Sequence, residues 1–242
     1  IKRNNILMNI LITGATSGIG FSILNQLKKD KTNKFFLISR KFKKNLSIKN
    51  TKNYKLDLSN IELLKKRIKI ILKDADNRID LIICNAGQGV FGEVQDINFE
   101  QYQKIMNINF YSHLLIIKSI IPIMKKQKFG HIVNIASGAG IVGLEKTSSY
   151  SISKSCMQIL IESMHKELSK YNIFPKNIFP GATKTNFFKK NIYIKHKAKI
   201  HGKDVKKISS LIVQNLFKKK VNIFCQKKTI ASFIIKAFPN LI

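Results

Sequence analysis

Short apolar runs alternate with longer amphipathic stretches from one end of the chain to the other. The short runs are rich in isoleucine, leucine, phenylalanine and valine, whereas the longer stretches repeat apolar residues at the spacing of one helix face. The pattern predicts strands at 9–13, 34–39, 53–57, 79–84, 130–136, 173–179 and 221–225. It predicts helices at 18–30, 59–73, 98–127, 148–171 and 203–218. This alternation indicates an α/β fold in which a parallel sheet of about seven strands is flanked by helices.

No internal repeat and no linker rich in glycine, serine or proline interrupts this alternation. The 242 residues suffice for one α/β domain with a substantial core, so we predict a single domain over 1–242. Pro175 falls inside the predicted strand 173–179, where it cannot donate a ladder hydrogen bond, so we expect a strand start or a bulge there. Ser59 is predicted to cap the helix that follows it.

The chain carries a formal net charge of +31, and only four of its 44 basic residues are arginines: Arg3, Arg40, Arg67 and Arg78. Proteins that recognise phosphates or base edges generally use arginine forks. Here the lysines are spread over every predicted helix, and isoleucine and asparagine are abundant with them. We interpret the charge as a compositional bias. Attraction to an anionic membrane surface and binding of nucleic acid are the alternatives.

Three widely spaced cysteines, Cys84, Cys156 and Cys225, indicate neither a disulfide framework nor a zinc cluster and fit a reducing compartment. The five histidines form no ligand pattern, so we predict no metal site. The chain passes from Ile1-Lys2-Arg3 into the first strand too soon for a signal peptide, and no apolar run approaches the roughly 20 residues that span a bilayer. We predict a cytoplasmic protein, with peripheral membrane contact as the alternative.

A glycine-rich turn joins the first predicted strand to the first predicted helix. Residues 13–20 read Thr-Gly-Ala-Thr-Ser-Gly-Ile-Gly. Glycine lets the main chain approach a pyrophosphate closely, and a helix N-terminus offers unpaired N–H groups and a partial positive charge. An ordinary strand-to-helix turn is the alternative, but the position after the first strand favours nucleotide binding.

The second predicted strand ends in Ser39-Arg40-Lys41. In dinucleotide-binding folds an acid at this point would bind the ribose 2′-hydroxyl of NAD. No acid is present, and Arg40, followed by Lys41, Lys43 and Lys44, suits a 2′-phosphate by charge and geometry. We therefore predict NADP(H) in preference to NAD(H), although these residues could also be ordinary members of a lysine-rich loop.

A possible catalytic group follows the fifth predicted strand, which ends in Ser137. Tyr150 and Lys154 lie four residues apart on one helical face. The spacing alone means little, since Tyr193 and Lys197 share it in a basic loop. Reduction of a ketone by hydride needs a proton, which a tyrosine can supply if a nearby ammonium lowers its pKa. Ser137 could donate a hydrogen bond to the carbonyl oxygen. A surface tyrosine on an amphipathic helix is the alternative.

The motifs TGATSGIG, CNAG, MNIN, NIAS, YSISK and FPGATKT, with Asp57 among them, follow one another from about residue 8 to residue 185. In this order they resemble the short-chain dehydrogenase/reductase family, which implies a Rossmann-type doubly wound parallel sheet. The resemblance implies the catalytic residues Ser137, Tyr150, Lys154 and Asn109, the last of which would position a water for proton relay to the lysine. The expected cofactor-binding residues are Gly14, Thr16, Ser17, Gly18, Ile19, Gly20, Arg40, Asp57, Asn85, Ala86, Gly87, Tyr150, Lys154, Pro180, Gly181, Thr183 and Thr185.

By this resemblance, residues 8–185 form the cofactor-binding and catalytic core, 186–220 a substrate lid and a helix, and 226–242 a C-terminal tail. Cys84 replaces the first asparagine of the family's Asn-Asn-Ala-Gly, which removes only a minor contact. The tail resembles that of members acting on lipid-like or steroid-like ketones. Its apolar residues at 230–238 have helical spacing, which fits an interfacial membrane anchor and equally a helix packed on its own domain or on a dimer mate.

These observations predict an NADPH-dependent oxidoreductase that reduces a ketone or aldehyde, with tyrosine as the proton donor and with a lipid-like compound as one possible substrate. The resemblance also implies a homodimer or homotetramer. A scaffold or sensor that keeps the fold and the nucleotide but lacks catalysis is the alternative.

Overall fold

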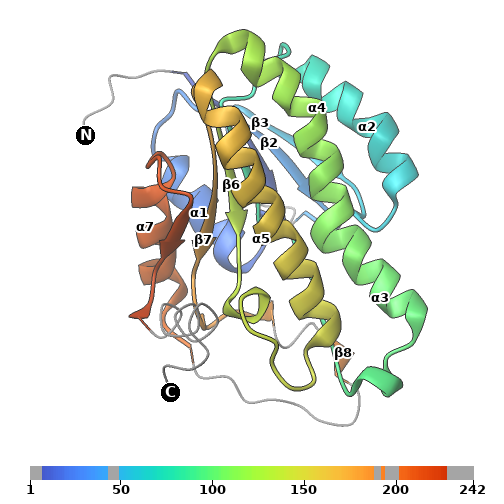
Figure 1. Cartoon of the computed structure of the whole chain (residues 1–242). Helices are drawn as coiled ribbons and strands as arrows, with labels where there is room; N and C mark the ends of the chain where they lie inside the picture. Colours follow the sequence, from blue (N-terminus) through green and yellow to red (C-terminus); the bar gives the residue numbers. More distant parts are fainter. Residues whose placement is uncertain (1–6, 43–48, 188–191, 194–201, 228–242) are drawn as a thin grey trace.

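The computed structural model describes residues 7–42, 49–187, 192–193 and 202–227. Its centre is a seven-stranded sheet in the order β3-β2-β1-β4-β6-β7-β9 (Figure 1). Every neighbouring pair in this sheet is parallel. The strands are β1 (Asn9–Thr13), β2 (Lys34–Ser39), β3 (Thr51–Lys55), β4 (Leu81–Cys84), β6 (Gly130–Ile135), β7 (Ile173–Phe179) and β9 (Asn222–Phe224). The predicted seven-stranded α/β fold is confirmed.

Helices cover both faces of the sheet (Figure 1). They are α1 (Gly18–Leu27), α2 (Ile61–Asp74), α3 (Phe99–Met106), α4 (Ser112–Gln127), α5 (Ser148–Leu168) and α7 (Val205–Asn215). Successive residues of a strand point to opposite faces, and β1 follows this rule. Leu11 packs in the core shared with α2, α4 and α5, whereas Ile10 and Ile12 pack in the core shared with α1 and α7.

The strand order reverses beside β1, because β2 lies on one side of it and β4 on the other. Such a switch point opens a crevice at the carboxyl ends of the strands, where ligands bind in open α/β sheets. The glycine turn follows β1 directly at this edge. Its first residue, Gly14, donates from its backbone N–H to the Ile38 carbonyl at the end of β2, at 2.8 Å.

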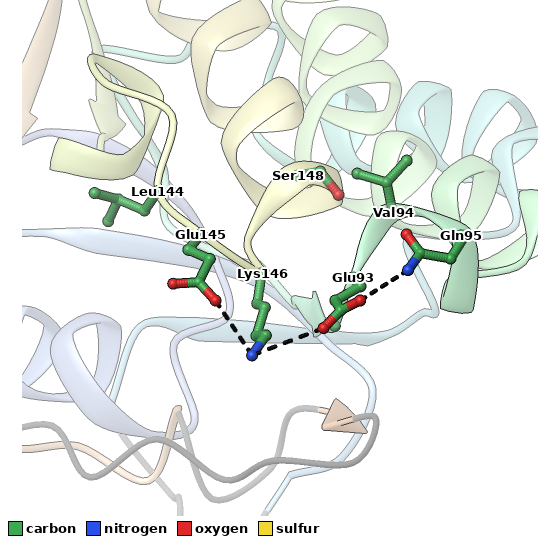
Figure 2. Close-up of a pocket in the computed structure, with 8 residues that line it drawn as sticks. Glu93, Val94, Gln95, Leu144, Glu145, Lys146 and Ser148 are labelled. Carbon is green, nitrogen blue, oxygen red and sulfur yellow. Dashed lines mark hydrogen bonds and ion pairs between the residues drawn. The ribbon is translucent and has the colours of Figure 1, made fainter.

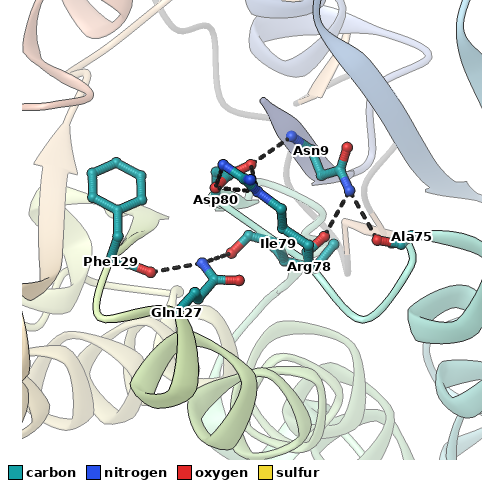
Figure 3. Close-up of polar contacts among 7 residues, drawn as sticks. All are labelled: Asn9, Ala75, Arg78, Ile79, Asp80, Gln127 and Phe129. Atoms are coloured by element: carbon teal, nitrogen blue, oxygen red, sulfur yellow. Dashed lines mark hydrogen bonds and ion pairs between the residues drawn. The ribbon is translucent and has the colours of Figure 1, made fainter. Parts of the chain in front are cut away.

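At the amino ends of the strands, opposite the glycine turn, buried polar contacts join β1 to the segment before β4 (Figure 3). Asp80, which is 1% exposed, accepts a hydrogen bond from the Asn9 backbone N–H at 2.8 Å and pairs with Arg78 at 3.0 Å. The Asn9 side chain donates to the carbonyls of Ala75 and Arg78, both at 2.9 Å. Gln127, at the end of α4, donates from its side chain to the backbone carbonyls of Ile79 and Phe129. These contacts fix the starts of β1 and β4 relative to each other.

The predicted helix 98–127 is not continuous. It consists of α3, a π-helical turn (Asn107–Tyr111) and α4. Hydrophobic periodicity does not distinguish a wide turn from an ordinary one, because the apolar face continues through it. The π turn carries Asn109, one of the residues predicted to be catalytic. π turns inside helices are frequent at functional sites.

Smaller differences also have local causes. The third strand is β3 (Thr51–Lys55), two residues before the predicted 53–57. Asn60, and not Ser59, caps α2, by accepting from the Leu63 N–H at 2.9 Å. Pro175 lies third in β7 and neither starts the strand nor forms a bulge. It is tolerated there because β9 pairs with β7 only from Asn177 onward.

Two short strands were not predicted. β5 (Val90–Phe91) pairs in parallel with β8 (Ile192–Tyr193), outside the main sheet. Two-residue strands are too short to show an alternating pattern. Much of the predicted lid (188–191 and 194–201) and the apolar tail stretch at 230–238 lie outside the described residues, as do Lys43, Lys44 and Lys197. None of the helices in the described part of the chain is long and apolar enough to cross a membrane.

Candidate active site

The glycine turn after β1 has the backbone geometry expected of a phosphate-binding turn. Gly14 and Gly18 have φ values of +69° and +56°, a region that residues with side chains rarely adopt. A Cβ on Gly14 would lie 2.9 Å from Ala86 Cα, so close packing also requires a glycine there. At Gly18 a Cβ would meet only Thr185, at 3.6 Å. The turn therefore packs tightly against the chain at Gly14 and less tightly at Gly18.

Helix α1 starts at Gly18, and its N-terminus has no side-chain cap. Ser17 is the N-cap residue, but its side chain makes no capping hydrogen bond, and no acidic residue occupies the first turn. The first backbone N–H groups of a helix have no intrahelical partner and attract anions. Thr16 and Ile19 are half-buried in the same turn. These features fit the pyrophosphate of a dinucleotide.

The loop after β4 is held against the glycine turn. Asn85 donates from its side chain to the carbonyls of Thr13 and Gly14, at 3.1 and 3.0 Å. The backbone N–H groups of Asn85 and Ala86 both donate to the Thr13 hydroxyl at 3.0 Å. Gly87 follows, and a Cβ there would lie 3.7 Å from Lys154 Nζ. The structure therefore brings this loop, the glycine turn and Lys154 together.

Arg40 and Asp57 lie near each other at the carboxyl ends of β2 and β3. Arg40 is exposed directly after β2. Burial raises the pKa of Asp57, but hydrogen bonds from Ser59 and the positive charge of Arg40 leave it below its usual value. Asp57 Oδ1 accepts from both the N–H and the hydroxyl of Ser59, at 2.9 Å. An exposed guanidinium therefore stands at this edge beside an ionised carboxylate.

Tyr150 lies near the start of α5, and its phenol lies close enough to the side chain of Ser137, which follows β6, for that side chain to lower its pKa. Two aromatic rings flank it. The ring centroids of Phe91 and Phe187 lie 5.8 and 5.6 Å from that of Tyr150. Phe91 comes from β5 and Phe187 from the segment after residue 185, so neither is near Tyr150 in sequence. The phenol therefore has a polar neighbour on one side and apolar rings on others.

Lys154 lies one turn further along α5 and is 6% exposed. Its Nζ donates to the Ile135 carbonyl at 2.9 Å and lies 5.9 Å from the centroid of the Tyr150 ring. Burial lowers the pKa of Lys154 from 10.5 to about 8. The buried thiol of Cys84 lies near enough to interact with this ammonium.

The expected lowering of the Tyr150 pKa is wrong for this structure. Burial raises the pKa of Tyr150 to about 12, and the Ser137 side chain offsets this only in part. The direction changes because Phe91 and Phe187 desolvate the phenol, and desolvation disfavours the phenolate. Tyr150 therefore keeps its proton at neutral pH.

Asn109 lies in the π turn and is 1% exposed. Its side chain accepts from the Gln88 N–H at 2.9 Å, donates to the Gln88 carbonyl at 2.8 Å and donates to the Ser153 hydroxyl at 2.8 Å. No hydrogen bond joins it directly to Lys154 among the described contacts. The amide therefore braces the loop after β4 against α5.

The segment after β7 closes the site opposite the glycine turn. Pro180 is buried, and Gly181 has a φ of +71°. Thr183 donates to the Gly181 carbonyl at 3.0 Å and forms an isolated bridge with Lys203. Thr185 faces Gly18 across the site. Of the predicted residues at 180–185, Thr185 is thus brought next to the glycine turn.

A pocket of about 340 Å³ adjoins the start of α5 (Figure 2). Lys146, which lines the pocket, forms ion pairs with its sequence neighbour Glu145 at 3.2 Å and with Glu93 at 3.9 Å. Its lining consists of Gly92, Glu93, Val94, Gln95, Leu144, Glu145, Lys146 and Ser148. Gly92 follows Phe91, and Ser148 precedes Tyr150 by two residues. The pocket therefore lies beside the segments that lead from Phe91 and into Tyr150, although neither residue lines it. In the part of the chain that is described, no three His, Cys, Asp or Glu side chains are grouped to hold a metal ion.

Sequence reasoning missed His113, which is 2% exposed in α4. Its Nε2 lies 2.9 Å from the Thr13 hydroxyl, and its Nδ1 lies 3.2 Å from the Asn109 carbonyl. Burial, together with the nearby charge of Lys154, lowers the pKa of His113 from 6.5 to about 4, although the hydrogen bond to the Asn109 carbonyl opposes this shift. A signal was available: a lone histidine on the apolar face of 112–127, four residues after the asparagine of the MNIN motif.

The low pKa of His113 predicts a specific loss of stability in acid. Below pH 6.5 the unfolded chain binds a proton that the folded chain excludes until about pH 4, so stability falls as the pH falls through that range. Between pH 7 and pH 5 this amounts to about 2 kcal/mol. We therefore expect the unfolding free energy of wild type to fall more between pH 7 and pH 5 than that of His113→Gln, and the difference between the two losses to be about 2 kcal/mol. The measurement is urea denaturation of both proteins at both pH values. Equal losses in the two proteins would contradict the assignment.

The family model of short chain dehydrogenases matches residues 8–193, more than three-quarters of the chain. Retinol dehydrogenase 8 of Bos taurus is 27% identical over 192 residues, which cover 74% of this chain and 60% of the relative. A 3-ketodihydrosphingosine reductase of Bacteroides thetaiotaomicron is 30% identical over 178 residues, which cover 74% of this chain and 65% of the relative. The chain thus spans less than two-thirds of the length of these relatives.

Solved structures share the fold. A short-chain dehydrogenase from Streptomyces avermitilis superposes with a TM-score of 0.84 at 18% identity, over 98% of this chain and 97% of that one. ElxO with NADP bound gives a TM-score of 0.77 at 21% identity, over 93% and 100%. A 4-hydroxyisoleucine dehydrogenase with NADH gives 0.74 at 24% identity, over 90% and 96%. Proteins of this fold therefore bind either dinucleotide.

Proposed function

Since the chain belongs to the short chain dehydrogenase family, we propose that it is an oxidoreductase that reduces a ketone or aldehyde reversibly, with NADPH as cofactor and Tyr150 as proton donor. The observation that carries the proposal is the setting of the Tyr150 phenol. It lies beside the Ser137 side chain, it is flanked by Phe91 and Phe187, and its pKa of about 12 keeps it protonated. A protonated phenol is the form that a reduction requires.

The bound NADPH would supply a hydride. Its pyrophosphate would be held by the glycine turn and by the N–H groups at the start of α1. The loop at Asn85 and Gly87 would bind the adenosine ribose, and Lys154 the nicotinamide ribose. The positive φ values of Gly14 and Gly18 and the uncapped start of α1 support this arrangement.

The protein's own residues would then handle the proton. Ser137 would donate a hydrogen bond to the substrate oxygen and so favour the charge that develops there. Tyr150 would give its proton to that oxygen. Lys154, whose ammonium is one helical turn away, would provide the charge that helps to return a proton to the phenolate. Asn109 would hold both helix α5 and the loop that follows β4 in place around this route of proton transfer.

Arg40 supports the preference for NADPH. Structures of the fold hold either NADP or NADH, so the fold itself does not decide the preference. A carboxylate after β2 would bind the two ribose hydroxyls of NADH, whereas a guanidinium would bind the 2′-phosphate. This chain has the guanidinium, exposed and at the edge where the adenosine would lie.

The rings beside Tyr150 favour an apolar carbonyl compound. Phe91 and Phe187 would contact the carbon atoms next to the carbonyl, and the pocket lined by Val94 and Leu144 near the start of α5 would receive an extended chain. The relatives named for retinol and for 3-ketodihydrosphingosine point to the same class. We assign 186–220 as the substrate lid and helix, and we expect a homodimer or homotetramer.

A screen for carbonyl-dependent NADPH oxidation tests the function. The purified chain would be assayed with ketosphingoid bases, retinal, steroids, acyl thioesters and small dicarbonyls. We expect turnover with at least one long-chain or ring-containing carbonyl, and weaker turnover with small dicarbonyls. Tight NADPH binding without turnover of any carbonyl would favour a non-catalytic scaffold instead.

The pKa of Lys154 predicts the pH dependence of the reduction. Its ammonium is present below about pH 8 and is lost as the pH rises through that value. We expect kcat for reduction to be constant near neutral pH and to fall by about tenfold per pH unit above the Lys154 pKa. The measurement is kcat at saturating NADPH and substrate, with folding checked by circular dichroism in each buffer. A constant kcat two pH units above that pKa would contradict the role of the ammonium.

A further inference from the structure

Behind the glycine turn, a buried histidine connects two segments that are distant in sequence. The hydroxyl of Thr13, at the end of β1, lies 2.9 Å from His113 Nε2, and His113 Nδ1 lies 3.2 Å from the Asn109 carbonyl in the π turn. Thr13, His113 and Asn109 are 0%, 2% and 1% exposed. Water therefore does not compete for these hydrogen bonds, and each group depends on its protein partners.

The contacts of Thr13 determine where the histidine proton is. A hydroxyl has one proton to donate and two lone pairs to accept with. The N–H groups of Asn85 and Ala86 occupy both lone pairs, each at 3.0 Å. The hydroxyl proton must therefore be donated, and His113 Nε2 at 2.9 Å is a closer acceptor than the Ile83 carbonyl at 3.5 Å. Nε2 is then unprotonated, so Nδ1 carries the proton and donates it to the Asn109 carbonyl.

We propose that His113 is a positioning residue that fixes the turn carrying Asn109 to the glycine turn; this inference rests on the proposed function. At one end, through Thr13, it orders the loop that would bind the adenosine ribose. At the other end it orients the π turn, whose Asn109 side chain braces Gln88 and Ser153. Ser153 in turn donates to the Tyr150 carbonyl at 2.8 Å. His113 thus joins the cofactor side of the site to the helix that carries the tyrosine.

The tautomer is tested without any cofactor. Long-range proton–nitrogen NMR spectra of the histidine rings distinguish Nδ1–H from Nε2–H. We expect His113 to be neutral with the proton on Nδ1 between about pH 5 and pH 7. An Nε2–H ring, or a ring that is charged near neutral pH, would overturn the inference. This result does not depend on whether the proposed function is right.

Three substitutions at position 113 test the positioning role. His113→Leu removes both hydrogen bonds and leaves the buried Thr13 hydroxyl without this acceptor, so we expect NADPH to bind about tenfold more weakly and kcat to fall about tenfold. His113→Gln can still accept from Thr13, and we expect it to restore NADPH affinity. His113→Asn can still donate to the Asn109 carbonyl, and we expect it to restore kcat more than affinity. Unchanged affinity and kcat in His113→Leu would overturn the inference.

A matched control separates positioning from general stability. His165 in α5 also has a ring nitrogen bonded to a backbone carbonyl, that of Pro175, at 2.7 Å, and it plays no part in the site. We expect His165→Leu to lower the melting temperature without changing NADPH affinity. An equal loss of affinity in both leucine variants would show that His113 acts only through stability. If wild type bound neither NADPH nor NADH, the proposed function would be wrong, and the NMR result would still decide whether the network exists.

Discussion

Tyr150→Phe is expected to lower kcat for carbonyl reduction by about 10²- to 10⁴-fold, the usual contribution of a general acid. The substitution removes the phenolic proton and leaves the ring that packs between Phe91 and Phe187. The fold and the cofactor site should therefore be preserved, and NADPH affinity should change by no more than about twofold. The measurement pairs steady-state kcat with a fluorescence titration of NADPH.

Tyr54→Phe is a suitable control for this variant. The hydroxyl of Tyr54 donates to Asp74 at 2.6 Å, at the edge strand β3 and away from Tyr150. Loss of this hydroxyl should lower stability and leave kcat unchanged. If Tyr150→Phe also kept its full kcat, the phenol would not be the proton donor and the enzymatic mechanism would have to be revised.

Arg40→Asp is expected to change the cofactor preference. The substitution removes the guanidinium proposed for the 2′-phosphate and introduces a carboxylate, which repels a phosphate and can accept from ribose hydroxyls. Lost hydrogen bonds to a charged group and the added repulsion together predict a fall of about a hundredfold in the ratio of kcat/KM for NADPH to that for NADH. The ratio is measured with one carbonyl substrate at fixed ionic strength.

Arg67→Asp provides the matched change in net charge. Arg67 is exposed on α2, so its replacement alters the overall charge equally but not the cofactor edge. The preference ratio should remain that of wild type in this control. The same ratio in Arg40→Asp as in wild type would mean that Arg40 does not recognise the 2′-phosphate.

The sequence was most informative where local pattern and chemistry coincide. The apolar run before Gly14 and the helix after Gly18 predicted β1, the turn and α1 within a few residues. Helical spacing placed Tyr150 and Lys154 on one face of α5, and the order of motifs, through the family resemblance, grouped them with Ser137. These predictions needed no knowledge of long-range packing.

Features that depend on distant segments could not be predicted in the same way. The pKa of Tyr150 rises because Phe91 and Phe187 reach it from elsewhere in the chain, whereas its sequence neighbour Lys154 suggested the opposite direction. The π turn changes which backbone groups point inward without changing the apolar pattern. His113 was missed for the same reason, since its partner Thr13 is 100 residues away.

The most direct test of the central claim is a crystal structure of the chain with NADP bound. We expect the pyrophosphate on the turn between Gly14 and Gly20, the 2′-phosphate beside Arg40, and the nicotinamide ring within contact distance of the Tyr150 hydroxyl. A nicotinamide that lies far from Tyr150, or a dinucleotide bound away from the glycine turn, would contradict the proposed enzyme.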